Sequence, residues 1–222
     1  MEFTFTESKK DPERDCFIYT AHDDLDLLGI AALRRRVPRD LFGRPAPVPD
    51  GGRGGTDPFA PHTTHLAVMV DGEIVAGAEL VAYSPLGLPL RSWKAASAVL
   101  TGHHRLVQCR RPLTLTAHAR AARPEMPFGA VGGLVKGCLQ WAVLHDVRYV
   151  VAEVADEAAA AALGQLGFEP VPGLPPSPGA QAVQLAVSQL VSRSFRSTSA
   201  FYRYLLEYDE GVLVQQRVAI PA

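Results

Sequence analysis

The sequence predicts one domain of the α/β (α+β) class, built on a mixed, mostly antiparallel sheet. Three patterns support this prediction: a β-hairpin, a continuous apolar strand, and a helical pattern on each side of that strand. With 222 residues, of which 47% are hydrophobic and 20% charged, the chain is long enough to bury a sizeable core. The order of the elements indicates an antiparallel meander that leads into a β-α-β-α-β unit.

The first half of the chain contains the hairpin. Its two strand-like runs are His65 to Val70 and Ile74 to Tyr83. They are joined by Asp71-Gly72, a pair typical of a two-residue hairpin turn. Upstream, Cys16 to Thr20 is a short strand-like run, and Asp23 to Arg36 has helical spacing with acids in its first turn.

The second half alternates strand and helix patterns. Leu106 to His118 is strand-like, and Pro112 within it predicts a bulge or a splayed edge because proline cannot donate to a ladder. Two segments have helical spacing, Gly129 to His145 and Asp156 to Leu166. Between them, Arg148 to Val154 is a nearly continuous apolar run of the kind found in buried strands.

The charge balance and the cysteines exclude several protein classes. The 22 Lys and Arg against 23 Asp and Glu argue against a protein that coats nucleic acid or binds membranes through basic residues. Cys16, Cys109 and Cys138 form no CxxC pair, so neither a disulfide framework nor a zinc ribbon is indicated. No apolar run reaches the length of a membrane span, and the acidic N-terminus is unlike a signal peptide. We expect a cytoplasmic protein.

Four histidines raise the question of a metal site. They are His62, His65, His103 and His104. The first two span a predicted loop-to-strand junction and the last two are adjacent, so neither pair converges on one ion from a regular element. No metal is assigned.

The basic residues are unevenly distributed. The 45 residues from Leu80 to Pro124 contain no Asp or Glu but seven basic residues: Arg91, Lys94, Arg105, Arg110, Arg111, Arg120 and Arg123. This stretch ends where a strand meets the predicted Gly129 to His145 helix, and helix N-termini attract anions. A phosphate or pyrophosphate ligand is one hypothesis. The alternative is that these charges are solvated or pair with the acid-rich segment Asp11 to Asp26.

The predicted splayed strand offers a second feature that a ligand could use. Its unpaired backbone groups could bind an extended, amide-containing molecule by strand addition. Together with the basic loop and the helix N-terminus, this favours a phosphopantetheine thioester over a nucleotide. The residues predicted to bind this cofactor are Arg111, Leu115, Thr116, Arg120, Arg123, Gly129 and Gly132.

Acyl transfer from a thioester to an amine needs a base, an oxyanion donor and a proton for the thiolate. Glu79 is the candidate base, because it is the only acid in its strand and alternation places it with Gly77 and Val81 on one sheet face. The alternative is an outward, solvated Glu79. A backbone N–H of the splayed strand would hold the oxyanion. His118 and Tyr202 are candidates for the acid, against a structural role for each.

Four segments carry a resemblance to a known family. They are Leu33 to Val37 (LRRRV), Thr56 to Leu66 (TDPFAPHTTHL), Val107 to Arg111 (VQCRR), and the helix–strand–helix region Gly129 to Val171, which contains Leu-Gly-Phe. They resemble the GNAT acyltransferases, in particular the branch of acyl-homoserine lactone synthases and long-chain N-acyl amino acid synthases. The resemblance covers about Cys16 to Val191. It implies a GNAT-like sheet with a splayed strand and helices on both faces.

The resemblance also implies site residues. Arg34, Asp57 and Phe59 match segments that would contact substrate, and Gln108 is a catalytic candidate where the branch has Glu. Ala60 replaces the second Asp of the acidic segment. The loss of these carboxylates argues against a sulfonium substrate such as S-adenosylmethionine.

Two further departures concern the donor. The general GNAT pyrophosphate signature keeps only its first glycine, Gly129, and Leu163 stands where many GNAT enzymes have a tyrosine acid. Plain acetylation from acetyl-CoA is therefore less supported than transfer of another acyl group. The resemblance implies acyl-CoA or an acyl carrier protein thioester as co-substrate, and the amine of a small molecule, amino acid or peptide as acceptor. The alternatives are a lactone (autoinducer) synthase and a non-catalytic module that binds an acyl ligand.

The chain ends in a predicted strand, Gln181 to Val191, and a predicted helix, Ser192 to Tyr208. We therefore expect a GNAT-like domain over residues 1–191 and a C-terminal helix and tail, 192–222, packed on it. An acyl carrier protein is a candidate partner, nucleic acid is not, and the protein is expected to be a monomer or homodimer.

Overall fold

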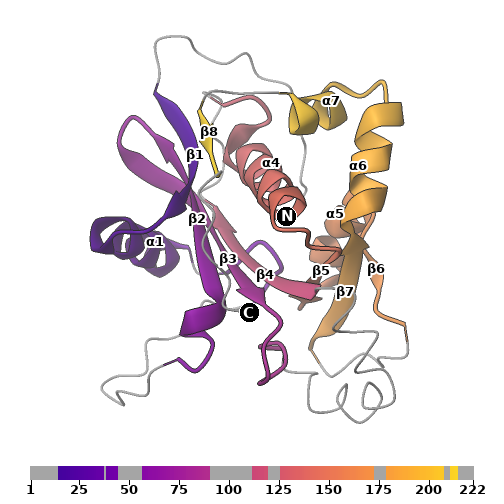
Figure 1. Cartoon of the computed structure of the whole chain (residues 1–222), viewed down its shortest axis with the longest axis horizontal. Helices are drawn as coiled ribbons and strands as arrows, with labels where there is room; N and C mark the ends of the chain where they lie inside the picture. Colours follow the sequence, from indigo (N-terminus) through magenta and orange to yellow (C-terminus); the bar gives the residue numbers. More distant parts are fainter. Residues whose placement is uncertain are drawn as a thin grey trace.

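The computed structural model describes residues 15–37, 39–44, 57–90, 112–119, 126–172, 179–207 and 211–214. These residues form one sheet with strand order β6-β7-β5-β4-β3-β2-β1-β8 (Figure 1). The strands are β1 Cys16–Ala21, β2 Thr63–Val70, β3 Glu73–Ala82, β4 Pro112–Ala119, β5 Tyr149–Val154, β6 Glu169–Pro170, β7 Gln181–Ala186 and β8 Val212–Leu213. The α-helices are α1 Asp24–Arg36, α4 Gly129–Leu144, α5 Glu157–Leu166, α6 Val187–Arg196 and α7 Ala200–Leu206.

The predicted meander and α/β unit are both present. Strands β1 to β4 pair antiparallel in sequence order, β4 pairs parallel with β5, and β5 pairs antiparallel with β7. The β2–β3 turn has positive φ at Asp71 (49°) and Gly72 (78°), which is the backbone of a type I′ hairpin turn. The predicted fold class is confirmed: the sheet is mixed and mostly antiparallel.

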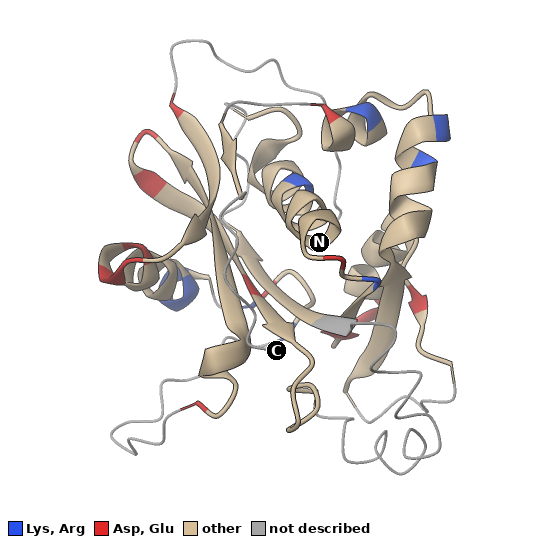
Figure 2. Ribbon diagram, in the orientation of Figure 1, with Lys and Arg blue, Asp and Glu red and all other residues tan. Residues whose placement is uncertain are grey.

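Helices cover both faces of the sheet (Figure 1). On one face, α1 packs through Ile30 against Ala21 and Ala67. On the other face, α4, α5, α6 and α7 contribute to the larger core. Figure 2 shows charged residues gathered on α1, α6 and α7, whereas most of α4 and of the strands is uncharged. None of the helices in the described ranges combines the length and apolar character that a membrane span needs.

The predicted splay exists, but its position differs from the expectation. Pro112 is the first residue of β4 and not an interruption within it, because a strand tolerates proline where its missing N–H needs no partner. Residues 106–111 lie outside the described part of the chain. Strands β4 and β5 pair only from Pro112 opposite Tyr149 to Thr114 opposite Val151, and beyond this point they diverge.

The C-terminal prediction was wrong in its boundaries. The strand predicted over Gln181 to Val191 ends at Ala186, and α6 begins at Val187 with no intervening turn. Val187, Leu190 and Ser194 are buried at helical spacing. The strand-like alternation of residues 181–186 hides this spacing in the sequence. The predicted single terminal helix is two helices separated by residues 197–199, and the expected boundary at 191 falls inside α6. The pairing of β8 with β1 was not anticipated.

Helix α4 approaches the sheet closely because its glycines lack side chains. A Cβ on Gly137 would overlap the side chain of Ile18 in β1, and one on Gly132 would overlap Phe128. By contrast, Gly164 in α5 is exposed and has no atom within 4 Å of an added Cβ. Gly137 and Gly164 thus form a matched pair of helical glycines, one in tight packing and one in open space.

We expect Gly137→Ala to lower the free energy of unfolding by about 1–3 kcal/mol, because the added methyl overpacks the α4–β1 contact. Gly164→Ala should raise it by up to about 1 kcal/mol, because alanine is the better helix former. Urea denaturation of both variants measures the difference. A Gly137→Ala variant as stable as the wild type would contradict this packing.

Candidate functional site

Polar side chains gather on the sheet face that α1 covers. Strand register places His65 of β2 opposite Glu79 of β3, and Glu79 opposite Thr116 of β4. Because side chains on one face recur every second residue, His118 lies on the same face as Thr116. Arg34 from α1, with Asp40 and Arg44 from the segment after it, joins this group. We call these seven residues the polar cluster: Arg34, Asp40, Arg44, His65, Glu79, Thr116 and His118.

Glu79 lies at the accessible part of the polar cluster. Its Oε1 is 2.6 Å from Nη2 of Arg34 and 4.0 Å from Nδ1 of His65. The side chains of Arg34 and Glu79 are 24% and 28% exposed, so solvent and a small solute can reach the ion pair. An accessible carboxylate held by a guanidinium is suited to accept a proton or to bind an ammonium group.

The two histidines of the polar cluster are held neutral. Burial lowers the pKa of His118, with a further contribution from the Arg34 charge. Burial also lowers the pKa of His65, against the opposing effect of Glu79. His118 is only 2% exposed, and neither of its ring nitrogens has a hydrogen-bond partner among the described residues. A buried imidazole in this state has unused donor and acceptor capacity that faces the cluster.

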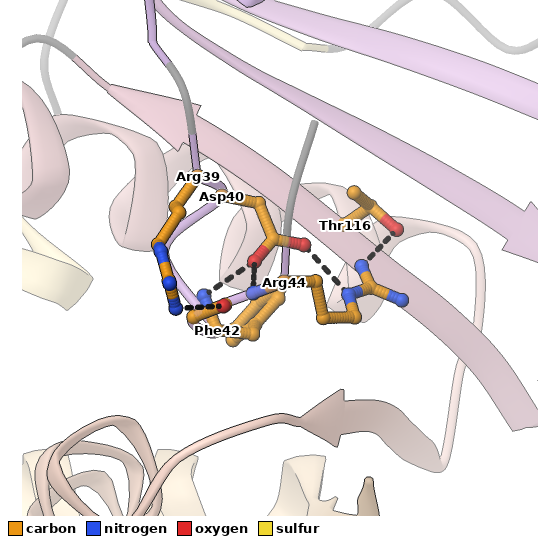
Figure 3. A network of polar contacts seen from close by, with 6 residues as sticks. Arg39, Asp40, Phe42, Arg44 and Thr116 are labelled. Atoms are coloured by element: carbon orange, nitrogen blue, oxygen red, sulfur yellow. Dashed lines mark hydrogen bonds and ion pairs between the residues drawn. The ribbon is translucent and has the colours of Figure 1, made fainter. Parts of the chain in front are cut away.

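The segment Arg39 to Arg44 forms a tight turn beside β4 (Figure 3). Oδ1 of Asp40 accepts hydrogen bonds from the backbone N–H groups of Phe42 (3.0 Å) and Arg44 (2.7 Å). Its Oδ2 accepts from Nε of Arg44 at 2.6 Å, and Nη2 of Arg44 donates to Oγ1 of Thr116 at 2.7 Å. The side chain of Asp40 is only 3% exposed, and these three hydrogen bonds compensate the loss of hydration of its carboxylate.

A small apolar cavity lies on the other face of β4. It has a volume of about 70 Å³ and is lined by side chains of β4, β5, β7, α4, α5 and α6, together with Leu41 and Phe42. Leu115 and Ala117 of β4 line this cavity, whereas their neighbours Thr116 and His118 belong to the polar cluster. Cys138 adds a thiol to the otherwise hydrocarbon lining. One strand therefore separates a polar site from an apolar one.

The structure brings some of the predicted site residues together. Glu79, His118, Thr116 and Arg34 share the polar cluster. Leu115 lies on the cavity side of the same strand. The other predicted cofactor and catalytic residues of this region lie outside the described part of the chain: Gln108, Arg111, Arg120 and Arg123.

Other predicted residues lie elsewhere. Tyr202 of α7 donates to the backbone oxygen of Gln165 at 2.9 Å, on the sheet face opposite the polar cluster. Asp57 shapes the turn before β2 by accepting from the N–H of Phe59 at 2.9 Å.

The start of α4 contains the two predicted phosphate-binding glycines. Gly129 is its first residue and has a φ of 68°, and Gly132 makes room for the side chain of Phe128. Packing thus accounts for the glycine at 132, while its role in phosphate binding stays a prediction.

Sequence reasoning missed the turn and most of the charged network. Arg44 meets Thr116 across 72 positions of sequence, and no local pattern predicts that contact. The sequence around His65 raises only the question of a metal site and does not predict its place beside Glu79. Among the described residues, no three His, Cys, Asp or Glu side chains are grouped to hold a metal ion.

Comparison with known proteins identifies the fold. No protein-family model matches the sequence. No curated protein matches it either. A structure of FeeM, an N-acyl amino acid synthase from uncultured soil microbes, matches with a TM-score of 0.58 and 14% identity over 81% of this chain and 94% of that one. The AHL synthase LasI matches with a TM-score of 0.54 and 16% identity over 92% of this chain and 99% of that one.

A third solved structure, of an agmatine N-acetyltransferase, has a TM-score of 0.50 and 15% identity over 78% of this chain and 99% of that one. At 14–16% identity, these three matches show a likeness of fold alone. The chain has the GNAT fold, and in fold it resembles the solved structures of an N-acyl amino acid synthase, an AHL synthase and an agmatine N-acetyltransferase.

Proposed function

We propose that the protein is an N-acyltransferase that moves an acyl group from a phosphopantetheine thioester to an amine. One observation carries this proposal. The accessible carboxylate of Glu79 lies on one side of the sheet and an apolar cavity on the other, and both border β4 where it parts from β5. A thioester carbonyl placed at the parting would face an amine on the polar side and keep its hydrocarbon chain on the apolar side.

The proposed reaction proceeds in two steps. The acceptor ammonium loses a proton to Glu79, directly or through a water molecule, and its nitrogen then attacks the thioester carbonyl. The C–N bond forms and the carbonyl oxygen becomes an oxyanion, for which a backbone N–H of β4 is the proposed donor. Collapse of this intermediate breaks the C–S bond, the nitrogen releases its second proton, and the thiolate takes one up. The products are an N-acyl amide and a free thiol.

His118 is given a hydrogen-bonding role in this scheme. Because burial lowers its pKa, the imidazole is neutral near pH 7 and holds no surplus proton to give to a thiolate. Its two unpartnered nitrogens instead suit a bound water or the acceptor itself. The acid role considered for His118 and Tyr202 is therefore replaced by the proton that the acceptor releases.

The charge of the polar cluster favours an amino acid as acceptor. Arg34 pairs with Glu79 and Arg44 with Asp40, while the two histidines are neutral, so the charges of the cluster sum to zero. A zwitterion can open the Arg34–Glu79 pair and replace it with carboxylate–Arg34 and ammonium–Glu79 pairs. A simple amine would leave Arg34 without a counterion. FeeM, which has a similar fold, is an N-acyl amino acid synthase, and this agrees with the choice of an amino acid.

The proposed thioester donor is supported by the basic residues in the sequence and by the apolar cavity. The cavity is lined almost wholly by apolar side chains, so it suits the hydrocarbon chain of an acyl group. We propose that the diphosphate of acyl-CoA, or the phosphate of an acyl carrier protein, binds at the start of α4 near Gly129 with the basic residues Arg111, Arg120 and Arg123. Whether CoA or the carrier protein is used is decided by the assay below.

A thiol-release assay tests the proposed function. With octanoyl-CoA or octanoyl carrier protein as donor, we expect one equivalent of thiol for each N-acyl product identified by mass spectrometry. Leucine and isoamylamine differ only in the carboxylate, and leucine should react about 10- to 100-fold faster because a charge-assisted hydrogen bond contributes about 1.5–3 kcal/mol. Equal rates would contradict the amino acid assignment. No thiol release with any donor and amine would favour a non-catalytic acyl-binding module.

Replacing the proposed base should reduce turnover without unfolding the protein. We expect Glu79→Gln to lower kcat/KM by about 10²- to 10⁴-fold, the usual contribution of general base catalysis. Glu73→Gln is the matched control, since β3 begins one residue before the predicted strand and so contains Glu73 as a second acid, whose Oε1 lies 3.5 Å from Nη1 of Arg36 and outside the polar cluster. Undiminished turnover in Glu79→Gln would move the base to another residue.

The buried neutral state of His118 predicts a pH dependence of stability. The pKa of His118 lies below its ordinary value of about 6.5, so between these values the unfolded chain binds a proton that the folded protein does not. The free energy of unfolding should therefore fall as the pH decreases below about 6.5, by at most about 1.4 kcal/mol per pH unit from this residue.

Urea titrations from pH 7 to pH 5 measure this slope. His118→Gln should have a shallower slope than the wild type, whereas His22→Gln, at an exposed position, should keep the wild-type slope. Parallel curves for His118→Gln and the wild type would show that His118 is not buried in its neutral form.

A further inference from the structure

The Arg39–Arg44 turn occupies the place where β4 and β5 stop pairing. The last paired residues are Thr114 and Val151. Three residues further along β4, the carbonyl of Ala117 accepts from the N–H of Leu41 at 2.8 Å. Just past β5, the N–H of Ala155 donates to the carbonyl of Phe42 at 2.9 Å. Two residues of the turn thus bridge the parted strands as a short substitute strand.

The side chains of the turn divide between the two faces of the sheet. Leu41 and Phe42 are 8% and 2% exposed and line the apolar cavity. Asp40 and Arg44 belong to the polar cluster, and Arg44 is bonded to Thr116 (Figure 3). The turn therefore separates the cavity from the cluster. A thioester whose acyl chain lies in the cavity and whose carbonyl faces the cluster would have to pass it.

The turn is held in place by side-chain contacts that centre on one carboxylate. Asp40 accepts from two backbone N–H groups of the turn and from the guanidinium of Arg44, which in turn reaches Thr116 on β4. Gly43 has a φ of 79°, and a Cβ there would overlap the carboxylate of Asp156 at the start of α5. Opening the turn thus requires the Arg44–Thr116 hydrogen bond and the two backbone hydrogen bonds to the strands to break, and Asp40 holds Arg44 in position for the first of these.

We propose that the Arg39–Arg44 turn is a gate over the apolar cavity, and that Asp40 is the positioning residue that latches it closed through Arg44. This inference rests on the proposed acyl transfer, because the acyl chain is what the gate would admit. Opening frees the carbonyl of Ala117 and the N–H of Ala155. The amides of a pantetheine arm are suited to bind both groups by strand addition, which would offset the two backbone hydrogen bonds that the turn gives up.

Reactivity of Cys138 tests the gate without any substrate. Cys138 lines the cavity and is half-buried, and burial raises the pKa of its thiol to about 12, so we expect its alkylation to be slow and to speed up when the cavity opens. Cys16, buried in β1, reports opening of the core elsewhere. In a Cys109→Ser background, N-ethylmaleimide labelling of the two cysteines is followed by peptide mass spectrometry.

The test variant is Asp40→Asn. Its Oδ1 still accepts from the backbone of the turn, but its amide group faces Nε of Arg44 and cannot accept from it. We expect Cys138 to be labelled about tenfold faster and Cys16 at the wild-type rate. Arg44→Gln, which removes the latch from the other side, should give the same result if Asp40→Asn fails to fold. Asp23→Asn, the same substitution at the N-cap of α1, should change neither rate.

Each outcome decides the proposal. Equal acceleration of Cys16 and Cys138 would show that Asp40 only stabilises the fold, and unchanged labelling of Cys138 would show that the turn is no gate. With an acyl-CoA donor, the donor KM should fall about tenfold, because the open state is more populated. An unchanged donor KM beside faster labelling would overturn the role in donor entry. Absence of all turnover would refute the proposed function, and labelling alone would then decide the gate.

Discussion

The parting of β4 and β5 is the constraint on which the rest of the site depends. Two parallel strands that pair over only three residues leave backbone donors and acceptors along the divergent part, and buried groups of this kind must find partners. The Arg39–Arg44 turn supplies them through Leu41 and Phe42. The apolar cavity, the polar cluster and the bridging turn are three consequences of one incomplete pairing.

Alternation along β4 turns this gap into a site with two chemically different sides. Thr116 and His118 face the charged residues, while Leu115 and Ala117 face hydrocarbon. A molecule placed across the strand would meet both environments within a few ångströms, because neighbouring side chains point to opposite faces. In the proposed reaction, the acceptor and the acyl chain would then lie on opposite faces of the strand and would not compete for space.

Local patterns in the sequence predicted the elements that carry their own boundary residues. Asp23 and Asp156 cap α1 and α5, Gly167 ends α5 in the left-handed region, and Asp71-Gly72 forms the hairpin turn. The break between α6 and α7 and the start of β4 at Pro112 were not predicted, because they depend on what lies beside them. Gly77 and Glu79 share a face as expected, but that Arg34 would pair with Glu79 is a tertiary fact.

The polar cluster could be predicted only in part, because most of its contacts join segments that are distant in the sequence. The pair Asp40–Arg44 is four residues apart and could have been noticed as a local contact, but its bond to Thr116 joins distant segments. The cavity has no sequence pattern at all, because it is the space that apolar side chains leave unfilled.

Electrostatics limits what such a site can bind. Asp40 can be buried in the cluster because Arg44 and two backbone N–H groups compensate its charge. His118 can be buried because its ring is neutral. A ligand with one net charge would disturb this balance, because it would pair with one member of the Arg34–Glu79 ion pair and leave the other without a counterion. A ligand that brings both charges would preserve it. On the proposed function, charge neutrality of the cluster would favour acceptors that carry an ammonium and a carboxylate on the same carbon over polyamines.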